Sequence, residues 1–465
     1  MTGARAAQSV PTPVFKPLGA VALMPPSQAA SFLIALGLAA SALSVDAQSQ
    51  TRPDSVHNRT DKPGKPGKPG LKAQQRPDAN SNAPQTEPIS AGRAKVRDGE
   101  TEARLIDIYQ LVGRGDMRSA LARAESLVDD HPNFQLAQLL YGDLLAGQTR
   151  PIRALGDVPD TMAQAAATQL AALRQESLLR LKALRERPAP GLIPSQFLSL
   201  SPRVRHAIAI DATRSRLYLF KNSSTGLKLL ADYYISVGKS GIEKSLEGDL
   251  RTPLGVYFVT ANLDPKSLKD FYGAGALPIN YPNQLDVKRG KTGSGIWLHG
   301  TPPGQFSRAP LASDGCVVLA NPDLERIVKT VEIRTTPVVI AQNLKWLAPH
   351  SVAADSKSFE EALTAWHAAK SSGDVARIMG WYAPDFTSYG KTLAEWAPAL
   401  QTEARQQAGR KVLIKDVSYL RWTDSADTMV VTFGELVQGA KSGRTKRQYW
   451  AWQNSQWKIF FEGVV

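Results

Sequence analysis

The sequence predicts a multidomain protein in which a mostly-β domain lies between an N-terminal α-helical segment and a C-terminal α+β unit. The chain has 465 residues, too many for one ordinary hydrophobic core, so two or three domains are expected. Apolar residues recur at helical spacing over 101–187, and short apolar runs bounded by turn residues follow over 203–347. From 356 to 465, helical stretches precede strand-like runs, the order typical of an α+β unit.

The first residues carry the pattern of an export signal. Basic residues precede an alanine-rich apolar run over 29–45, and small residues suit cleavage after Ala47, which predicts a signal peptide over 1–47 and a periplasmic protein. The charged leader is long, so Met24 is an alternative start. An uncleaved N-terminal membrane anchor is a further alternative, although the apolar run is short for a span of about 20 residues.

Residues 48–100 predict a disordered basic linker. They are rich in Pro, Lys, Asn and Gln, include the repeat KPGKPGKPG, and hold too few apolar residues to build a core. The whole chain has a net charge of +14 and a pI near 9.7, which favours acidic partners such as a wall polymer or anionic lipid. Export argues against nucleic acid, and a generally solvated basic surface is the alternative.

The helical segment over 101–187 looks like one tetratricopeptide-type helix pair followed by a second, degenerate pair. Its small residue Ala120 and the helix-ending Pro132 stand where such a pair places them. A stack this short is marginal alone, so we expect it to pack on the next domain. A protein partner in its groove is the alternative role.

The C-terminal unit over 356–465 resembles the nuclear transport factor 2-like fold. Two amphipathic stretches, FEEALTAWHAAKSSG and DVARIMGWYAPDF, precede three strand-like segments that close with a Trp-rich hairpin. The resemblance implies an α+β cone whose pocket could hold a ligand or a glycan strand, while bracing of the enzyme or dimerisation is the alternative. The tryptophans are first of all core candidates: Trp366, Trp381, Trp422, Trp450, Trp452 and Trp457.

Cys316 and His299 are the candidate reactive residues of the β-rich domain. Cys316 is the only cysteine, so it cannot form an internal disulfide, and an exported protein gains nothing from an exposed idle thiol. Gly315 before it allows a tight turn that aims backbone N–H groups at a developing oxyanion. His299 ends the apolar run GIWLHG and could return to the thiol across a Gly- and Pro-rich loop. Taken singly, each residue could equally be an ordinary core or strand-end residue.

Together these residues resemble the L,D-transpeptidase catalytic domain family. The motifs are HGTP followed by SDGCVVL, with IDATRSRLYLF and VGKSGIEKSLEGDLRTPLGVYFV upstream, and they cover roughly 203–345. The resemblance implies a mostly-β domain with Cys316 as nucleophile and His299 as general base and then acid. It also implies that the Gly300 carbonyl orients the imidazole, and that Ser313 with the amides of Gly315 and Cys316 borders the oxyanion site. No metal or organic cofactor is needed, because proton transfer and oxyanion binding supply the catalysis.

The implied substrate is a peptidoglycan stem peptide. Attack on the amide between an L-centre and D-alanine releases D-alanine and leaves a thioester, which an amine converts to a cross-link in an L,D-transpeptidase. Water would give a trimmed tripeptide, as in an L,D-carboxypeptidase linked to cell shape. A catalytically inactive wall-binding scaffold is the alternative from a different class. The sequence does not indicate the oligomeric state.

Two residues depart from the family motif. Asp314 stands where a second histidine is usual, and Val318 stands where Asn or Arg is common. An unpaired carboxylate would raise the pKa of the thiol. We therefore expect Asp314 to bond its own turn, point away or pair with a cation such as Arg308 or Arg251.

Five residues are candidate substrate contacts. A stem peptide carries carboxylates that cations could bind, and an aromatic ring or an amide could line the cleft. The candidates are Arg251, Lys239, Tyr272, Asn280 and Asp314. A basic face or an ordinary loop explains these residues equally well.

Overall fold

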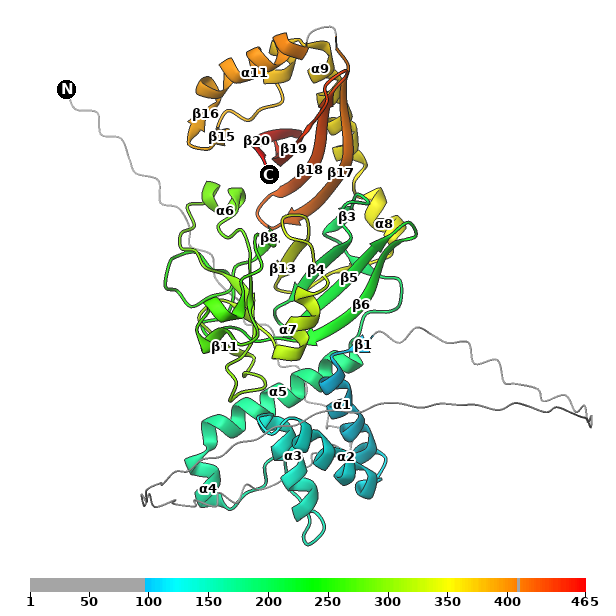
Figure 1. The fold of residues 1–465 in the computed structure, drawn as a ribbon, viewed down its shortest axis with the longest axis vertical. Helices are drawn as coiled ribbons and strands as arrows, with labels where there is room; N and C mark the ends of the chain where they lie inside the picture. The colour runs from blue at the N-terminus through cyan, green and yellow to red at the C-terminus, as the bar shows by residue number, and fades with distance from the viewer. Residues whose placement is uncertain (1–96, 408–409) are drawn as a thin grey trace, which may run out of the picture.

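The computed structural model describes residues 97–407 and 410–465. The predicted signal peptide and all but the last residues of the predicted linker lie outside the described residues. Three layers follow one another along the long axis in Figure 1: a helical segment, a central β-rich domain, and a C-terminal unit of helices on a curved sheet. Within the described ranges, no helix combines the length and apolar character needed to cross a bilayer.

The helical segment consists of α1 (Glu100–Gly113), α2 (Met117–Asp130), α3 (Gln135–Ala146), α4 (Asp160–Ala165) and α5 (Ala167–Arg185). Asp116 caps α2 by accepting a hydrogen bond from Ser119 N–H, after a turn in which Gly115 has a φ of +79°. The tetratricopeptide-like character of these helices stays a prediction.

The helical segment packs on the central domain. Phe306 and Ala320 of the central domain are buried in the helical core, and the Phe134 and Phe306 rings lie 4.3 Å apart. Strand β1 (Arg97–Asp98) precedes the first helix and pairs in parallel with β6 (Gly226–Tyr234), so this strand lies inside the range predicted as linker. The expected packing on the next domain is therefore confirmed.

The central domain is built on a six-stranded sheet in the order β1-β6-β5-β4-β13-β8. Its other members are β4 (His206–Asp211), β5 (Arg216–Ser223), β8 (Gly255–Phe258) and β13 (Pro337–Ala341). Alternate residues of β4 enter different cores: Ile208 and Ile210 face one, and Ala207 and Ala209 face the other. Both faces of the sheet are therefore covered.

Shorter elements cover the first face and carry the candidate site. A three-stranded sheet joins β9 (Ala276–Pro278), β10 (Trp297–His299) and β12 (Val317–Val318), while β11 (Leu311–Ser313) pairs with β7 (Val237–Gly238). The domain also contains η1 (Pro265–Ser267), η2 (Asp270–Tyr272), α6 (Gln284–Lys288), α7 (Asn321–Val328), and the pair β2 (Ile193–Pro194) and β14 (Trp346–Leu347). Leu285 of α6 and Trp346 of β14 pack in the core on the second face.

The C-terminal unit has a five-stranded antiparallel sheet in the order β20-β19-β18-β17-β3. Its elements are α8 (Pro349–Ala354), α9 (Lys357–Ser372), α10 (Val375–Met379), β15 (Thr387–Ser388), β16 (Lys391–Thr392), α11 (Leu393–Gln407), β17 (Val412–Thr423), β18 (Asp427–Val437), β19 (Arg444–Gln453) and β20 (Gln456–Val464). Asn454 and Ser455 both have positive φ and form the tight turn of the predicted Trp-rich hairpin.

The edge strand of this sheet comes from another part of the chain. Strand β3 (Phe197–Ser199) precedes the central domain, yet it pairs with β17. Helices α9 and α11 cover one face of the sheet, and the other face shares a core with the central domain (Figure 1). An ion pair between Arg289 and Asp424 adds to this junction, with 2.6 Å between Nη2 and Oδ1.

Candidate active site

Strand pairing brings His299 and Cys316 together. Strands β10 and β12 are parallel, with Leu298 opposite Val317 and His299 opposite Val318. Cys316 directly precedes β12 and therefore lies beside Trp297, two residues before His299. The intervening loop leaves one strand and returns to its neighbour, so residues 17 positions apart in sequence share one edge of a small sheet.

The His299 side chain is fixed and uncharged. It is 1% exposed, and its Nδ1 lies 2.7 Å from the Gly300 carbonyl oxygen. Because a carbonyl only accepts hydrogen bonds, Nδ1 carries the proton and Nε2 is left as a base. Burial lowers the pKa of His299 to about 4, and repulsion from Arg308 acts in the same direction, against the Gly300 hydrogen bond.

The Cys316 thiol is protonated at rest. It is partly exposed, with Sγ 3.5 Å from the Gly295 carbonyl oxygen. Burial raises the pKa of Cys316, and the Asp314 carboxylate adds to this effect, while the Trp297 backbone and the charge of Arg308 act against it. The resting pair is thus a thiol and a neutral imidazole, an arrangement suited to general-base activation during attack.

A glycine turn sets the position of the thiol. Gly315 has a φ of +120°, and a Cβ there would come 2.7 Å from the Arg251 carbonyl oxygen, so only glycine fits without strain. The Thr252 hydroxyl donates to the Gly315 carbonyl at 2.9 Å and accepts from Gly238 N–H at 2.9 Å. The turn before Cys316 is therefore tied to the segment around 238–252.

Ser313 takes up one of the two amides expected at the oxyanion site. Its Oγ donates to the Cys316 carbonyl at 2.6 Å and accepts from Gly315 N–H at 3.1 Å. The amide of Cys316 has no protein acceptor within the described part of the chain. In this geometry Ser313 holds the turn, and the Cys316 N–H is the amide left for a developing oxyanion.

Asp314 pairs with a lysine and not with the arginines expected. Its Oδ1 lies 2.8 Å from Lys239 Nζ, and both side chains are at least half exposed. Pairing of β7 with β11 sets Gly238 opposite Ser313, so Lys239 follows directly beside Asp314. The Arg251 guanidinium instead donates to the Ile242 carbonyl at 2.9 Å. Pairing of Asp314 with a cation is therefore confirmed, but the cation is Lys239 and not one of the two arginines named as examples.

Two other candidate contacts have different surroundings. The Tyr272 ring lies 5.1 Å from the His299 ring and 4.8 Å from Trp297, and its carbonyl accepts from Gly300 N–H, so it forms a wall beside the imidazole. Asn280 Oδ1 accepts from Phe258 N–H at 2.6 Å. Its side chain supports β8 and is not gathered with Cys316.

Arg308 is a site residue that the sequence suggested only as a partner for Asp314. It is 8% exposed, and its guanidinium lies 4.5 Å from the Phe271 ring centroid. Its charge lowers the pKa of both His299 and Cys316, so it lies within electrostatic range of both. No motif marks it, since its position depends on how the loop folds back.

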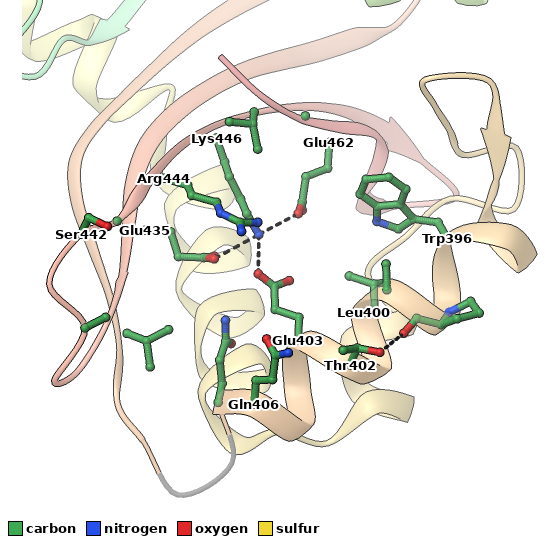
Figure 2. A pocket seen from close by; sticks show the side chains of 18 of the residues that line it. Trp396, Leu400, Thr402, Glu403, Gln406, Glu435, Ser442, Arg444, Lys446 and Glu462 are labelled. Carbon is green, nitrogen blue, oxygen red and sulfur yellow. Dashed lines mark hydrogen bonds and ion pairs between the residues drawn. The ribbon is translucent and has the colours of Figure 1, made fainter.

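A separate polar cavity of about 680 Å³ lies in the C-terminal unit between α11 and strands β18 to β20 (Figure 2). Lys446 Nζ lies 2.8 Å from Glu403, 3.0 Å from Glu435 and 3.2 Å from Glu462. Burial alone would raise the pKa of Glu403, but Lys370 and Lys446 hold it at about 2. Across the described residues, no cluster of His, Cys, Asp and Glu is suited to hold a metal ion.

The class of protein domain to which the central domain is similar follows from its fold and from the cysteine and histidine on neighbouring strands. Residues 205–340 match the family model of the L,D-transpeptidase catalytic domain, and residues 358–463 match that of the Cds6 C-terminal NTF2-like domain. Both parts of the resemblance drawn from the sequence are thereby confirmed. No curated protein matches the chain at a significant level.

Comparison with solved structures finds the following similarities. Bd1075 from Bdellovibrio bacteriovorus is 22% identical with a TM-score of 0.50, over 59% of this chain and 98% of that chain, and at this identity it shows the fold alone. Pgp2 from Campylobacter jejuni, titled a helical cell shape determining protein, is 20% identical over 62% and 99%, with a TM-score of 0.45. An L,D-transpeptidase from Mycobacterium smegmatis is 14% identical over 30% and 59%, with a TM-score of 0.20.

Proposed function

We propose that the protein is a peptidoglycan L,D-transpeptidase that forms an acyl-enzyme on Cys316. The observation that carries the proposal is the pairing of β10 with β12, which sets a neutral His299 of fixed tautomer beside the strand that follows Cys316. The predicted signal peptide supports a periplasmic location, where the wall polymer is accessible.

The first half-reaction forms a thioester. His299 Nε2 accepts the thiol proton as Cys316 Sγ attacks the carbonyl carbon between the L-centre and D-alanine, and the Cys316 N–H stabilises the negative oxygen. Collapse breaks the C–N bond. The departing nitrogen takes the proton from the imidazolium, and D-alanine leaves.

The second half-reaction releases the acyl group. An amine of another stem loses a proton to His299 and attacks the thioester carbonyl, which forms a cross-link and returns the proton to the thiolate. Water in the same position gives a tripeptide, which is the carboxypeptidase alternative with a role in cell shape. The partly exposed thiol and the half-exposed Asp314 and Lys239 at its rim leave room for either acceptor.

Product analysis with residues 97–465 tests the proposal. This range keeps the helical segment that packs on the site. Incubation with a disaccharide-tetrapeptide, beside Cys316→Ala, should give cysteine-dependent dimers by mass spectrometry. Cysteine-dependent tripeptide without dimers would make the protein a carboxypeptidase.

The inactive scaffold is favoured by one observation, the combined effect of burial and Asp314 in raising the pKa of the thiol. A carbapenem-type electrophile separates this alternative from the enzyme. A mass adduct that disappears in Cys316→Ala shows an activated thiol. Absence of both adduct and turnover in a folded protein supports the scaffold.

A further inference from the structure

A second cavity adjoins the candidate active site, between the helical segment and the loop that connects His299 to Cys316. Its volume is about 380 Å³. One wall comes from α3 and α5 and the other from the loop before β11. The polar lining residues are Gln135, Gln169, Glu176, Gln305, Ser307 and Arg308.

Arg308 is the cation of this lining, and the Asp314 carboxylate acts on it only from beyond ion-pair distance. Glu176 is already engaged, because it accepts from Arg180 at 2.6 Å and from Ser307 Oγ at 2.8 Å. Within residues 97–407 and 410–465, no carboxylate lies within ion-pair distance of Arg308, which is 92% buried. Some buried side-chain nitrogen and oxygen atoms of these residues have neither solvent contact nor a hydrogen-bond partner, and no nitrogen of Arg308 is one of them. The nitrogens of Arg308 therefore stay in contact with solvent, and an anion that reached them would pair with a cation that has no ion-pair partner among the described residues.

The position of Arg308 connects the cavity to the reacting atoms. Its charge acts on both Cys316 and His299. The Phe271 ring that it covers also packs on the His299 ring, with 5.8 Å between centroids. An anion held by Arg308 would therefore lie within electrostatic range of both side chains and beside the ring that packs on His299.

The loop that carries Arg308 is held from both sides. Tyr234 Oη donates to the Arg308 carbonyl at 2.9 Å, and Phe306 N–H donates to the Asn133 carbonyl at 3.1 Å. Asn133 Nδ2 in turn donates to the Pro303 carbonyl at 2.8 Å. The backbone that carries the guanidinium is thus held in place without a ligand, which reduces the ordering cost of binding.

We propose that this cavity is a substrate subsite, in which Arg308 binds a carboxylate of the stem peptide and the helical segment supplies amide-bearing walls. The inference rests on the proposed function and deepens it. Glutamine amides both donate and accept hydrogen bonds, as a peptide backbone requires. Two carboxylates qualify: that of the terminal D-alanine and, where the third residue is a diamino diacid, that of its side chain.

Substrates with one carboxylate blocked test the subsite. Residues 97–465 receive three disaccharide-tetrapeptides: the free acid, the C-terminal carboxamide and the third-residue side-chain carboxamide. Wild-type kcat/KM should fall about tenfold to a hundredfold on one carboxamide, the usual effect of losing a charged hydrogen bond. On the free acid, kcat/KM of Arg308→Gln should be lower than that of the wild type by a similar factor. Its kcat/KM should not change further when that same carboxylate is blocked. Arg308→Lys should recover part of the loss in kcat/KM.

The control is Lys329→Gln, which removes one cation from an exposed side chain on the far end of α7. Equal wild-type rates on all three substrates would overturn the subsite, as would an equal loss by Arg308→Gln on all three. Calorimetric binding to Cys316→Ala gives the same comparison without turnover. It therefore separates failure of the subsite from failure of the proposed enzyme activity.

Discussion

The imidazole of His299 and the thiol of Cys316 are both shifted toward their uncharged forms. Burial is the first cause in each case, since it removes water from the charged state. A preformed thiolate and imidazolium pair is therefore not the resting state. In the proposed mechanism the thiol proton moves to His299 only during attack on the substrate.

The pH dependence of kcat/KM should report this neutral histidine. Protonated His299 cannot accept the thiol proton, so activity is lost as the pH falls through its pKa of about 4, well below the ordinary 6.5. The measurement is a pH–rate profile on the tetrapeptide. In Arg308→Gln the acid limb should move to higher pH, because one repulsive charge is gone. An acid limb near 6.5 in the wild type would contradict the buried imidazole.

Substitutions of Asp314 and of Lys239 should shift the pKa of the Cys316 thiol in opposite directions. Asp314→Asn removes a carboxylate that raises the pKa of Cys316, so alkylation by iodoacetamide at neutral pH should be faster than in the wild type. Lys239→Gln leaves that carboxylate unpaired and should slow alkylation. Equal rates in both variants would show that Asp314 does not act on the thiol.

At the scale of elements, four charged residues join α11 to the inner face of β18 to β20. Lys446 of β19 is 6% exposed and contacts carboxylates of α11, β18 and β20, as Figure 2 shows. Lys370 of α9 contacts two of the same carboxylates, at 3.2 Å from Glu403 and 2.7 Å from Glu435. Two lysines therefore balance three acids, and only Lys446 contacts all three.

Lys446→Met should destabilise the protein by about 3 to 5 kcal/mol, the usual effect of breaking a buried ion pair. The folded pKa of Glu403 is about 2, below the ordinary 4.5, so its stabilising effect is present above pH 4.5 and is lost as the pH falls toward 2. The difference between variant and wild type should therefore shrink in acid. Denaturant unfolding at two pH values measures it, with the exposed Lys415→Met of β17 as control. If Lys415→Met lowers the free energy of unfolding as much as Lys446→Met does, the buried charge cluster has no special stabilising effect.

At the scale of the whole molecule, the central domain is held between two partners. Phe306 of the active-site loop is 6% exposed and lies in the core of the helical segment. On the opposite face, Tyr218 and Phe258 share a core with Tyr449 and Phe461 of the C-terminal sheet. The loop that connects His299 to Cys316 therefore packs as one unit with the helical segment.

Removal of residues 97–187 should loosen the loop around Phe306 and reduce kcat/KM. Hydrogen exchange over 300–310 should be slow in residues 97–465 and fast in the truncated chain, because the hydrogen bonds and burial from Asn133 and Phe134 are lost. Phe306→Ala in the longer chain is the matched variant that removes the contact alone. If hydrogen exchange over 300–310 is unchanged after truncation, the loop keeps its structure without the helical segment.

The sequence alone could predict the parts of the site that depend on local order. His299, Gly315 and Cys316 lie in short motifs, and the strands that carry them show as apolar runs. The partner of Asp314 could not be predicted, because it depends on the pairing of β7 with β11. The cavity at Arg308 and the pairing of β3 with β17 arise likewise from contacts between distant segments.

The pairing of β3 with β17 can form only late in synthesis of the chain. It is synthesised before the central domain, but its partner β17 emerges only after that domain is finished. The nascent chain therefore holds an unmatched strand until the last part is made. For the same reason, a recombination point in the linker after 347 would separate β17 from its neighbour. A transplanted C-terminal unit must carry residues 197–199 with it to close its own edge.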